Sequence, residues 1–146
     1  VRVGHTFIKQ AMKEHGGLFA GEHSAHYFFK ENWNADSGII AAVIMLGFIS
    51  ASGKKLSTLR KEYGKYKESG EINFTVLDIP SKLSELKEVF KDAAQDYLDG
   101  VTFSGDGWWV NVRPSNTEPL LRLNAEADTE EVLQEKVAAF TKVITG

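Results

Sequence analysis

The sequence has no cysteine, few prolines and no excess of positive charge. Without cysteine, neither a disulfide framework nor a metal site with thiolate ligands is possible, and a reducing, cytoplasmic location is expected. The net charge of −3 argues against a nucleic-acid-binding protein, because contact with a polyphosphate backbone usually needs a basic face. Any site for an anion must therefore be local.

Long apolar runs are also missing. The longest, residues 38–51, is shorter than the roughly 20 residues that a membrane-spanning helix needs, and we interpret it as a buried helix. No secretory signal pattern opens the chain, and its first residue is Val1 rather than Met. We expect no association with a membrane, and we expect the chain to be a fragment of a longer protein that lacks an N-terminal portion.

The composition is that of a globular protein, with 42% hydrophobic and 25% charged residues in 146. In the first half, helical periodicity covers residues 6–15 and 38–51, and short apolar stretches at 18–20 and 27–29 are typical of strands. Asp36 and Ser37 are suitable N-caps for the second helix. This half is predicted to be a partial α/β domain. The basic residues 54–67 are predicted to form a linker or hinge helix with a solvated face, and a contribution of these residues to a phosphate-binding cleft stays an alternative.

The second half shows a clearer alternation of elements. The pattern predicts a strand at 73–79, a helix from 83 to 97 and a hairpin of residues 101–103 and 108–112, with Asp106-Gly107 as its turn. A strand at 120–127 and a helix that begins with a capping box at Asp128 follow. The order indicates a small α+β domain in which helices lie on one face of an antiparallel sheet.

The loop after the hairpin is rich in groups that bind anions. It holds a guanidinium, whose planar fork matches phosphate oxygens two at a time, and neutral donors that suit the remaining oxygens. Two flanking prolines restrict the free loop and so lower the entropy lost on binding. These residues, Arg113, Ser115, Asn116 and Thr117, fit a phosphate monoester. The same residue types also suit an ordinary turn with a surface arginine, which stays an alternative.

A second polar loop, GEHSAH, lies in the first half. Glu22, Ser24 and His26 alternate, so an extended segment would aim all three side chains to one side, where they suit a polyhydroxylated ligand. His5 is a further candidate contact. A metal site of His23, His26 and Glu22 does not match the helical H-E-x-x-H spacing, and a Ser24–His26 nucleophile pair lacks an orienting carboxylate. We therefore predict no metal site and no catalytic residue in this chain.

Three stretches together resemble a known family. GHTFIK at 4–9, GEHSAH at 21–26 and RPSNTEP at 113–119 are similar, in order and separation, to motifs of the α-D-phosphohexomutases, in their bacterial phosphomannomutase/phosphoglucomutase branch. The resemblance covers nearly the whole chain. It implies that residues 1–66 are the C-terminal part of the family's third domain with its hinge, and that residues 70–146 are the fourth domain.

The resemblance also implies roles. Sugar-binding residues would be Glu22, Ser24, His26 and His5, and residues binding the phosphate that is not transferred would be Arg113, Ser115, Asn116 and Thr117. The family's isomerase reaction interconverts hexose 1-phosphate and hexose 6-phosphate through a 1,6-bisphosphate.

That reaction needs a phosphoserine, Mg²⁺ held by an Asp-rich loop, and hexose 1,6-bisphosphate as activator. The sequence has no Asp-x-Asp-x-Asp run and no serine in the Thr-Ala-Ser-His-Asn-Pro context. We expect this chain to bind hexose phosphate but no cofactor, and to be inactive alone.

Two differences from the common family motif leave the identity of the sugar substrate open. The common sugar loop is Gly-Glu-Met-Ser-Gly-His, whereas this chain has His23 and Ala25, so the preference between mannose and glucose phosphates is unsettled. A phosphoglucosamine mutase fragment is an alternative, but that branch has glycine where Asn116 stands. A non-catalytic sugar-phosphate binding module is the alternative from another class.

Overall fold

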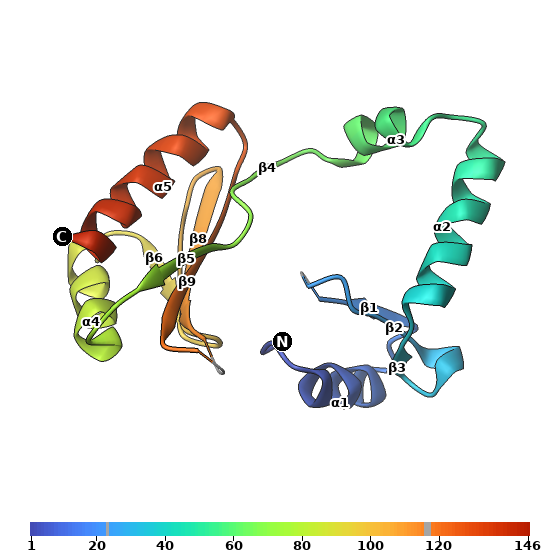
Figure 1. Ribbon diagram of the computed structural model, residues 1–146, viewed down its shortest axis with the longest axis horizontal. Coiled ribbons are helices and arrows are strands. Elements are labelled where there is room, and N and C mark those ends of the chain that lie inside the picture. Colours follow the sequence, from blue (N-terminus) through green and yellow to red (C-terminus); the bar gives the residue numbers. More distant parts are fainter. Residues whose placement is uncertain (23, 116–117) are drawn as a thin grey trace. The chain divides into compact units, whose positions relative to one another are not determined.

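The computed structural model describes residues 1–22, 24–115 and 118–146, which form two compact units, Val1–Tyr63 and Gly64–Gly146. Each unit has its own sheet (Figure 1). The elements of the first unit are α1 (His5–His15), β1 (Phe19–Gly21), β2 (Tyr27–Phe29), the 3-10 helix η1 (Lys30–Asn32), β3 (Ala35–Asp36), α2 (Gly38–Ser52) and α3 (Leu56–Tyr63).

The first unit is an α/β portion with a three-stranded antiparallel sheet in the order β1-β2-β3. Its buried core is small and consists of Ile8 and Met12 of α1 and Phe28 of β2. The helix α1 ends at Gly16, which adopts the left-handed conformation typical of a helix C-terminus. Packing of α1 against the sheet places the start of this helix beside the β1–β2 loop.

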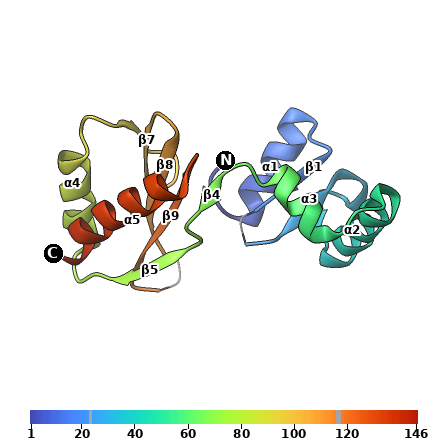
Figure 2. The ribbon, with the colours of Figure 1, turned by 90° about the horizontal axis from the view of Figure 1, so that it is seen from above.

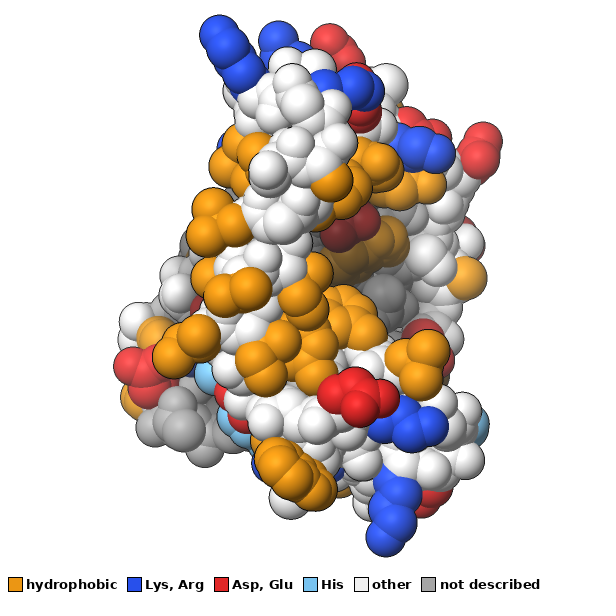
Figure 3. Space-filling view, turned by 90° about the vertical axis from the view of Figure 1, so that its right-hand side faces the viewer, with side chains coloured by type: hydrophobic (Ala, Val, Ile, Leu, Met, Phe, Trp, Pro, Cys, Tyr) orange, Lys and Arg blue, Asp and Glu red, His pale blue; other side chains and the backbone are white. Residues whose placement is uncertain are grey.

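The helix α2 forms as predicted, and Ser37 caps it by accepting a hydrogen bond from the N–H of Ile40. The prediction that this helix is buried is wrong for this chain, because none of its residues is buried. Ile39 and Leu46, for example, are 80% and 66% exposed. Figure 3 shows apolar side chains gathered over the face that carries α2. The elements packed around α2 are too few to cover a helix that is apolar on every side.

No single helix in the described part of the chain is long and apolar enough to cross a membrane. Only α2 and α3 taken together reach that length and composition, and they are bent by 95° at their junction.

The second unit is an antiparallel sheet with two helices. Its elements are β4 (Lys67–Glu68), β5 (Ile72–Thr75), α4 (Ile79–Val89), β6 (Ala94–Asp96), β7 (Val101–Gly105), β8 (Trp108–Pro114), β9 (Leu120–Ala127) and α5 (Glu130–Thr145). The strand order is β4-β9-β8-β7-β6, and β5 also pairs with β9. Both helices lie on one face of the sheet (Figures 1 and 2). The predicted fold class is thus confirmed.

The core of the second unit lies between this sheet and the two helices. Alternate residues of β8 and β9 point inward, as the period of two in a strand requires, and those fully buried are Val110, Val112, Leu121 and Leu123. Phe140 of α5 is also fully buried. Its ring stacks on Phe90 at 3.8 Å and meets the edge of Phe103 at 5.1 Å, measured between ring centroids. Phe140 therefore joins the helix layer to the sheet.

Three predicted boundaries in the second unit were wrong. The strand at 73–79 is shorter, because Asp78 caps α4 and the chain is already helical at Ile79. The helix predicted to reach 97 ends at Val89, and residues 94–96 pair with β7 as β6. Thr129 rather than Asp128 is the N-cap of α5. Asp128 instead donates its N–H to the carbonyl of Gly107, in the turn between β7 and β8.

The Asp78 cap predicts a pH dependence of stability. The backbone N–H of Ser81, and then its hydroxyl, donate to this carboxylate and lower the pKa of Asp78. A lowered pKa means that the stabilisation is present above the unfolded pKa of about 3.9 and is lost as the pH falls through the folded value. In urea denaturation, Asp78→Ala is expected to be less stable than the original chain near neutral pH, and the difference should shrink below about pH 4.

The matched control is Asp78→Asn, which keeps a capping oxygen but cannot titrate. Its stability relative to Asp78→Ala should stay constant over the same pH range. A constant difference between the original chain and Asp78→Ala down to about pH 2 would contradict the assignment.

Candidate functional site

The loop between β1 and β2 is a tight turn. The N–H of Glu22 donates to the carbonyl of His26 at 2.9 Å, and the N–H of Ala25 donates to the carbonyl of Glu22 at 3.0 Å. Ala25 has φ 64°, in the left-handed region. The extended conformation predicted for this loop is therefore wrong: the turn, not alternation, brings Glu22 and His26 together. Ser24 lies exposed in the turn, and His23 lies outside the described residues.

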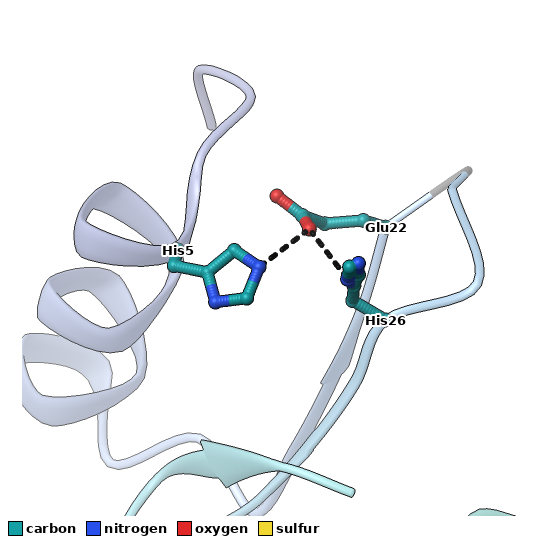
Figure 4. A group of neighbouring side chains, drawn as sticks. All are labelled: His5, Glu22 and His26. Atoms are coloured by element: carbon teal, nitrogen blue, oxygen red, sulfur yellow. Dashed lines mark ion pairs between the residues drawn. The ribbon is translucent and has the colours of Figure 1, made fainter. Parts of the chain in front are cut away.

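The turn places Glu22 between two imidazoles, those of His5 and His26 (Figure 4). One oxygen of Glu22, Oε1, accepts the backbone N–H of Gly4 at 3.0 Å. The other, Oε2, lies 3.9 Å from Nε2 of His5 and 3.9 Å from Nδ1 of His26. The side chain of Glu22 is only 7% exposed. We call these three residues, His5, Glu22 and His26, the His–Glu–His cluster.

Neighbouring elements support the two imidazoles. Nδ1 of His5 lies 3.6 Å from Oδ1 of Asp36 in β3, and its ring stands edge-on to His26 at 4.7 Å and to Phe28 at 5.3 Å. Nδ1 of His26 is buried and has no hydrogen-bond partner among the described residues. The cluster thus offers a fixed carboxylate and two ring nitrogens, groups that exchange hydrogen bonds with hydroxyls.

In the second unit, Arg113 lies near the end of β8, directly opposite Arg122 of β9. Like charges in this position repel, and Glu71 lies between them. Its carboxylate is 3.4 Å from Nη2 of Arg113 and 3.5 Å from Nη1 of Arg122, and Glu118 is 3.2 Å from Nη2 of Arg122. The two guanidinium side chains are 14% and 23% exposed. We call these four residues, Arg113, Arg122, Glu71 and Glu118, the arginine cluster.

Backbone packing fixes the position of Arg113. Gly100 has φ +69°, and a Cβ atom placed on it would lie 2.5 Å from Cβ and 2.7 Å from Cα of Arg113. Only glycine allows this approach. Beyond β8, Ser115 donates its N–H to the carbonyl of Leu120, and its hydroxyl accepts the N–H of Glu118 at 3.2 Å. The other two predicted phosphate-binding residues, Asn116 and Thr117, lie outside the described residues.

The sequence interpretation missed several residues of these two sites. Arg122 had a usable signal, because a hairpin centred on the 115–119 loop places it opposite Arg113. Glu71 had none, since its position follows from the pairing of β5 with β9, about fifty residues apart in sequence. Asp36 was identified only as a candidate cap.

The Mg²⁺ that the family resemblance implies does not fit these residues. Mg²⁺ takes oxygen ligands in octahedral geometry. Within the described ranges, the one grouping of His, Asp or Glu side chains able to hold a metal ion is the His–Glu–His cluster, which offers two nitrogens and one carboxylate. Imidazole ligands suit zinc and other transition metals.

Comparison with family models matches both units. Residues 1–66 match "Phosphoglucomutase/phosphomannomutase, alpha/beta/alpha domain III", and residues 71–143 match "Phosphoglucomutase/phosphomannomutase, C-terminal domain". The two matches follow each other along the chain and together cover nearly all of it.

Comparison with individual proteins indicates the same family. The chain is 47% identical over 98% of its length to a phosphomannomutase of Methanocaldococcus jannaschii, and 38% identical over 95% to a phosphomannomutase/phosphoglucomutase of Pseudomonas aeruginosa. A crystal structure of a phosphoglucomutase/phosphomannomutase family protein from Burkholderia thailandensis matches 97% of the chain, with a TM-score of 0.77 and 25% identity. The chain spans 32%, 31% and 31% of these three proteins, respectively.

Proposed function

The chain belongs to the phosphoglucomutase/phosphomannomutase family, and we propose that it supplies the substrate-recognition part of a phosphohexomutase. In this proposal, residues 1–66 are the C-terminal part of the third domain and residues 70–146 are the fourth. The parent enzyme interconverts hexose 1-phosphate and hexose 6-phosphate. Its phosphoserine and Mg²⁺ belong to domains that this chain does not include, because the sequence has neither of the corresponding loops.

The arginine cluster is the observation that carries the proposal. Arg113 and Arg122 lie side by side at one end of the sheet, and Nε of Arg122 is buried without a hydrogen-bond partner among the described residues. A guanidinium has five N–H donors, more than the single carboxylate of Glu71 engages. A phosphate ester accepts such donors in pairs, so it fits beside Arg113 better than a neutral ligand does.

The His–Glu–His cluster supports sugar binding. A carboxylate that already accepts one backbone hydrogen bond keeps acceptor sites on its second oxygen, and sugar hydroxyls are suitable donors. The imidazoles of His5 and His26, which flank that oxygen, exchange further hydrogen bonds with the same hydroxyls. Ser24 belongs to this proposal on the family resemblance alone. Its exposed position in the turn leaves its hydroxyl accessible.

Substitution of Arg113 tests the phosphate half of the proposal. Arg113→Ala should weaken binding of mannose 6-phosphate by roughly 10-fold to 150-fold, since each charge-assisted hydrogen bond contributes about 1.5 to 3 kcal/mol. The affinity of Arg113→Lys should lie between those of the original chain and Arg113→Ala, because lysine keeps the charge but not the planar fork of donors. NMR titration of the 146-residue chain, which detects weak binding, measures the affinities.

Arg60→Ala removes an exposed arginine of α3 and serves as the control. It should bind like the original chain. Equal affinity of Arg113→Ala and Arg60→Ala for the ester would exclude Arg113 from the phosphate site.

A further inference from the structure

We propose that the His–Glu–His cluster binds a divalent transition-metal ion such as Zn²⁺, with His5, Glu22 and His26 as the three protein ligands. Each residue offers one ligand atom, and these atoms lie within 4.8 Å of one another. Two nitrogens and one carboxylate form a common ligand set for zinc sites that keep a fourth position open. The proposal of direct metal binding is argued from this geometry and does not depend on the proposed function.

The distances fit a metal ion better than a set of hydrogen bonds. Oε2 of Glu22 is 3.9 Å from Nε2 of His5 and 3.9 Å from Nδ1 of His26, too far for a hydrogen bond in either case. Zinc bonds of about 2.0–2.1 Å place tetrahedral ligands about 3.3–3.4 Å apart. The two Glu22–histidine separations therefore need to shorten by about half an ångström, and the separation of the two histidine nitrogens, which is within 4.8 Å, by at most about 1.5 Å. Rotations of the partly exposed side chains of His5 and His26 provide this movement.

The surroundings also have the features of a metal site. The outer nitrogen of His5, Nδ1, faces the carboxylate of Asp36 at 3.6 Å, and a carboxylate in this place orients a metal-binding imidazole once it accepts the ring N–H. The outer oxygen of Glu22 is fixed by the N–H of Gly4. Nδ1 of His26 faces Glu22 and is buried without a hydrogen-bond partner among the described residues. A buried ring nitrogen in this state gains a partner when a metal ion binds.

Because the same three side chains are assigned to sugar hydroxyls, Zn²⁺ and hexose phosphate should compete, so that zinc acts as an inhibitor of substrate binding. This competition rests on the proposed function, whereas metal binding does not. The metal-binding proposal and the sugar assignment can therefore be tested separately. Binding of Zn²⁺ without competition from hexose phosphate would count against the sugar assignment only.

The experiment titrates the 146-residue chain with ZnCl₂ in a calorimeter and with CoCl₂ in a visible spectrometer. We expect one Zn²⁺ per chain and the intense visible bands of tetrahedral Co²⁺. His5→Gln, Glu22→Gln and His26→Gln should each weaken binding at least about tenfold, and Asp36→Asn about 10-fold to 100-fold. MgCl₂ in the same range should neither bind nor displace Zn²⁺.

Two controls isolate the ligand set. His15→Gln changes an exposed histidine at the end of α1 and should bind Zn²⁺ like the original chain. His23→Gln tests the alternative set of His23, His26 and Glu22, and it too should leave binding unchanged. Circular dichroism verifies that each variant is folded. In the unmutated chain, Co²⁺ should shift the NMR signals of the His5 and His26 rings, which provides a result independent of substitution.

Absence of a bound Zn²⁺, or unchanged affinity in His5→Gln, would overturn the proposal. A loss of binding in His23→Gln equal to that in His5→Gln would overturn the ligand set.

Discussion

Replacement of Gly100 by alanine is expected to lower the free energy of unfolding of the second unit by at least about 3 kcal/mol. Two effects add. A non-glycine residue at φ +69° is strained, and a new Cβ would lie 2.5 Å and 2.7 Å from atoms of Arg113 and also overlap the carbonyl oxygen of Val112. Both obstacles include backbone of the central strand β8, so neither moves without disrupting the sheet.

The matched control is Gly70→Ala. Gly70 lies in the same unit and has nearly the same φ, +65°, but a Cβ there meets nothing within 4 Å. The difference between the two variants isolates the overlap with β8 from the backbone strain. Urea denaturation followed by tryptophan fluorescence measures this difference. A Trp33→Phe background restricts the signal to the second unit, because the remaining tryptophans, Trp108 and Trp109, both lie there. Equal stability of the two variants would show that Gly100 does not pack against Arg113 as described.

Phe140→Ala is the other change with a large expected effect, a loss of about 3 to 5 kcal/mol from the second unit. Its ring is fully buried and has three aromatic neighbours: Phe90 at 3.8 Å, Phe103 at 5.1 Å and Trp108 at 6.4 Å. Truncation removes both the buried apolar area and these ring contacts, and it leaves a cavity between the helices and the sheet.

Tyr66→Ala controls for the loss of an aromatic ring as such. Tyr66 lies in the second unit and is 58% exposed, so its removal should change stability by less than about 0.5 kcal/mol. The same denaturation assay reports both variants. A comparable loss in the two would mean that the Phe140 contacts do not determine the stability of this core.

Local signals in the sequence predicted most of the second unit, because its helices and strands carry their own caps and periodicity. The strand over 120–127 and the β7–β8 hairpin with its Asp106-Gly107 turn are examples. The strand β6 was missed because its residues Ala94–Asp96 have no strand pattern, and only pairing with β7 makes them a strand. In the first unit, the helical pattern of α2 was clear, but sequence cannot show how much of a helix its neighbours cover.

Most residues of the candidate sites could be identified from the sequence, but their arrangement in space could not. The loop histidines, Glu22 and Arg113 were all identified in the sequence. The reason given for grouping Glu22 with His26 was wrong, because a turn and not an extended strand joins them. The salt-bridge partner of Arg113, Glu71, is positioned by the non-local β5–β9 pair, so it could not be predicted from a single sequence.

The arginine cluster has a consequence for the rate at which anions arrive. Its two guanidinium groups are matched by the carboxylates of Glu71 and Glu118, so the four charges cancel at distances beyond the cluster. Long-range steering of a ligand depends on an unbalanced local charge and is weakened by salt. The association rate of a phosphate ester at Arg113 should therefore be the ordinary diffusional rate, nearly independent of ionic strength. Selectivity for the phosphate group should then come from a slow dissociation rate.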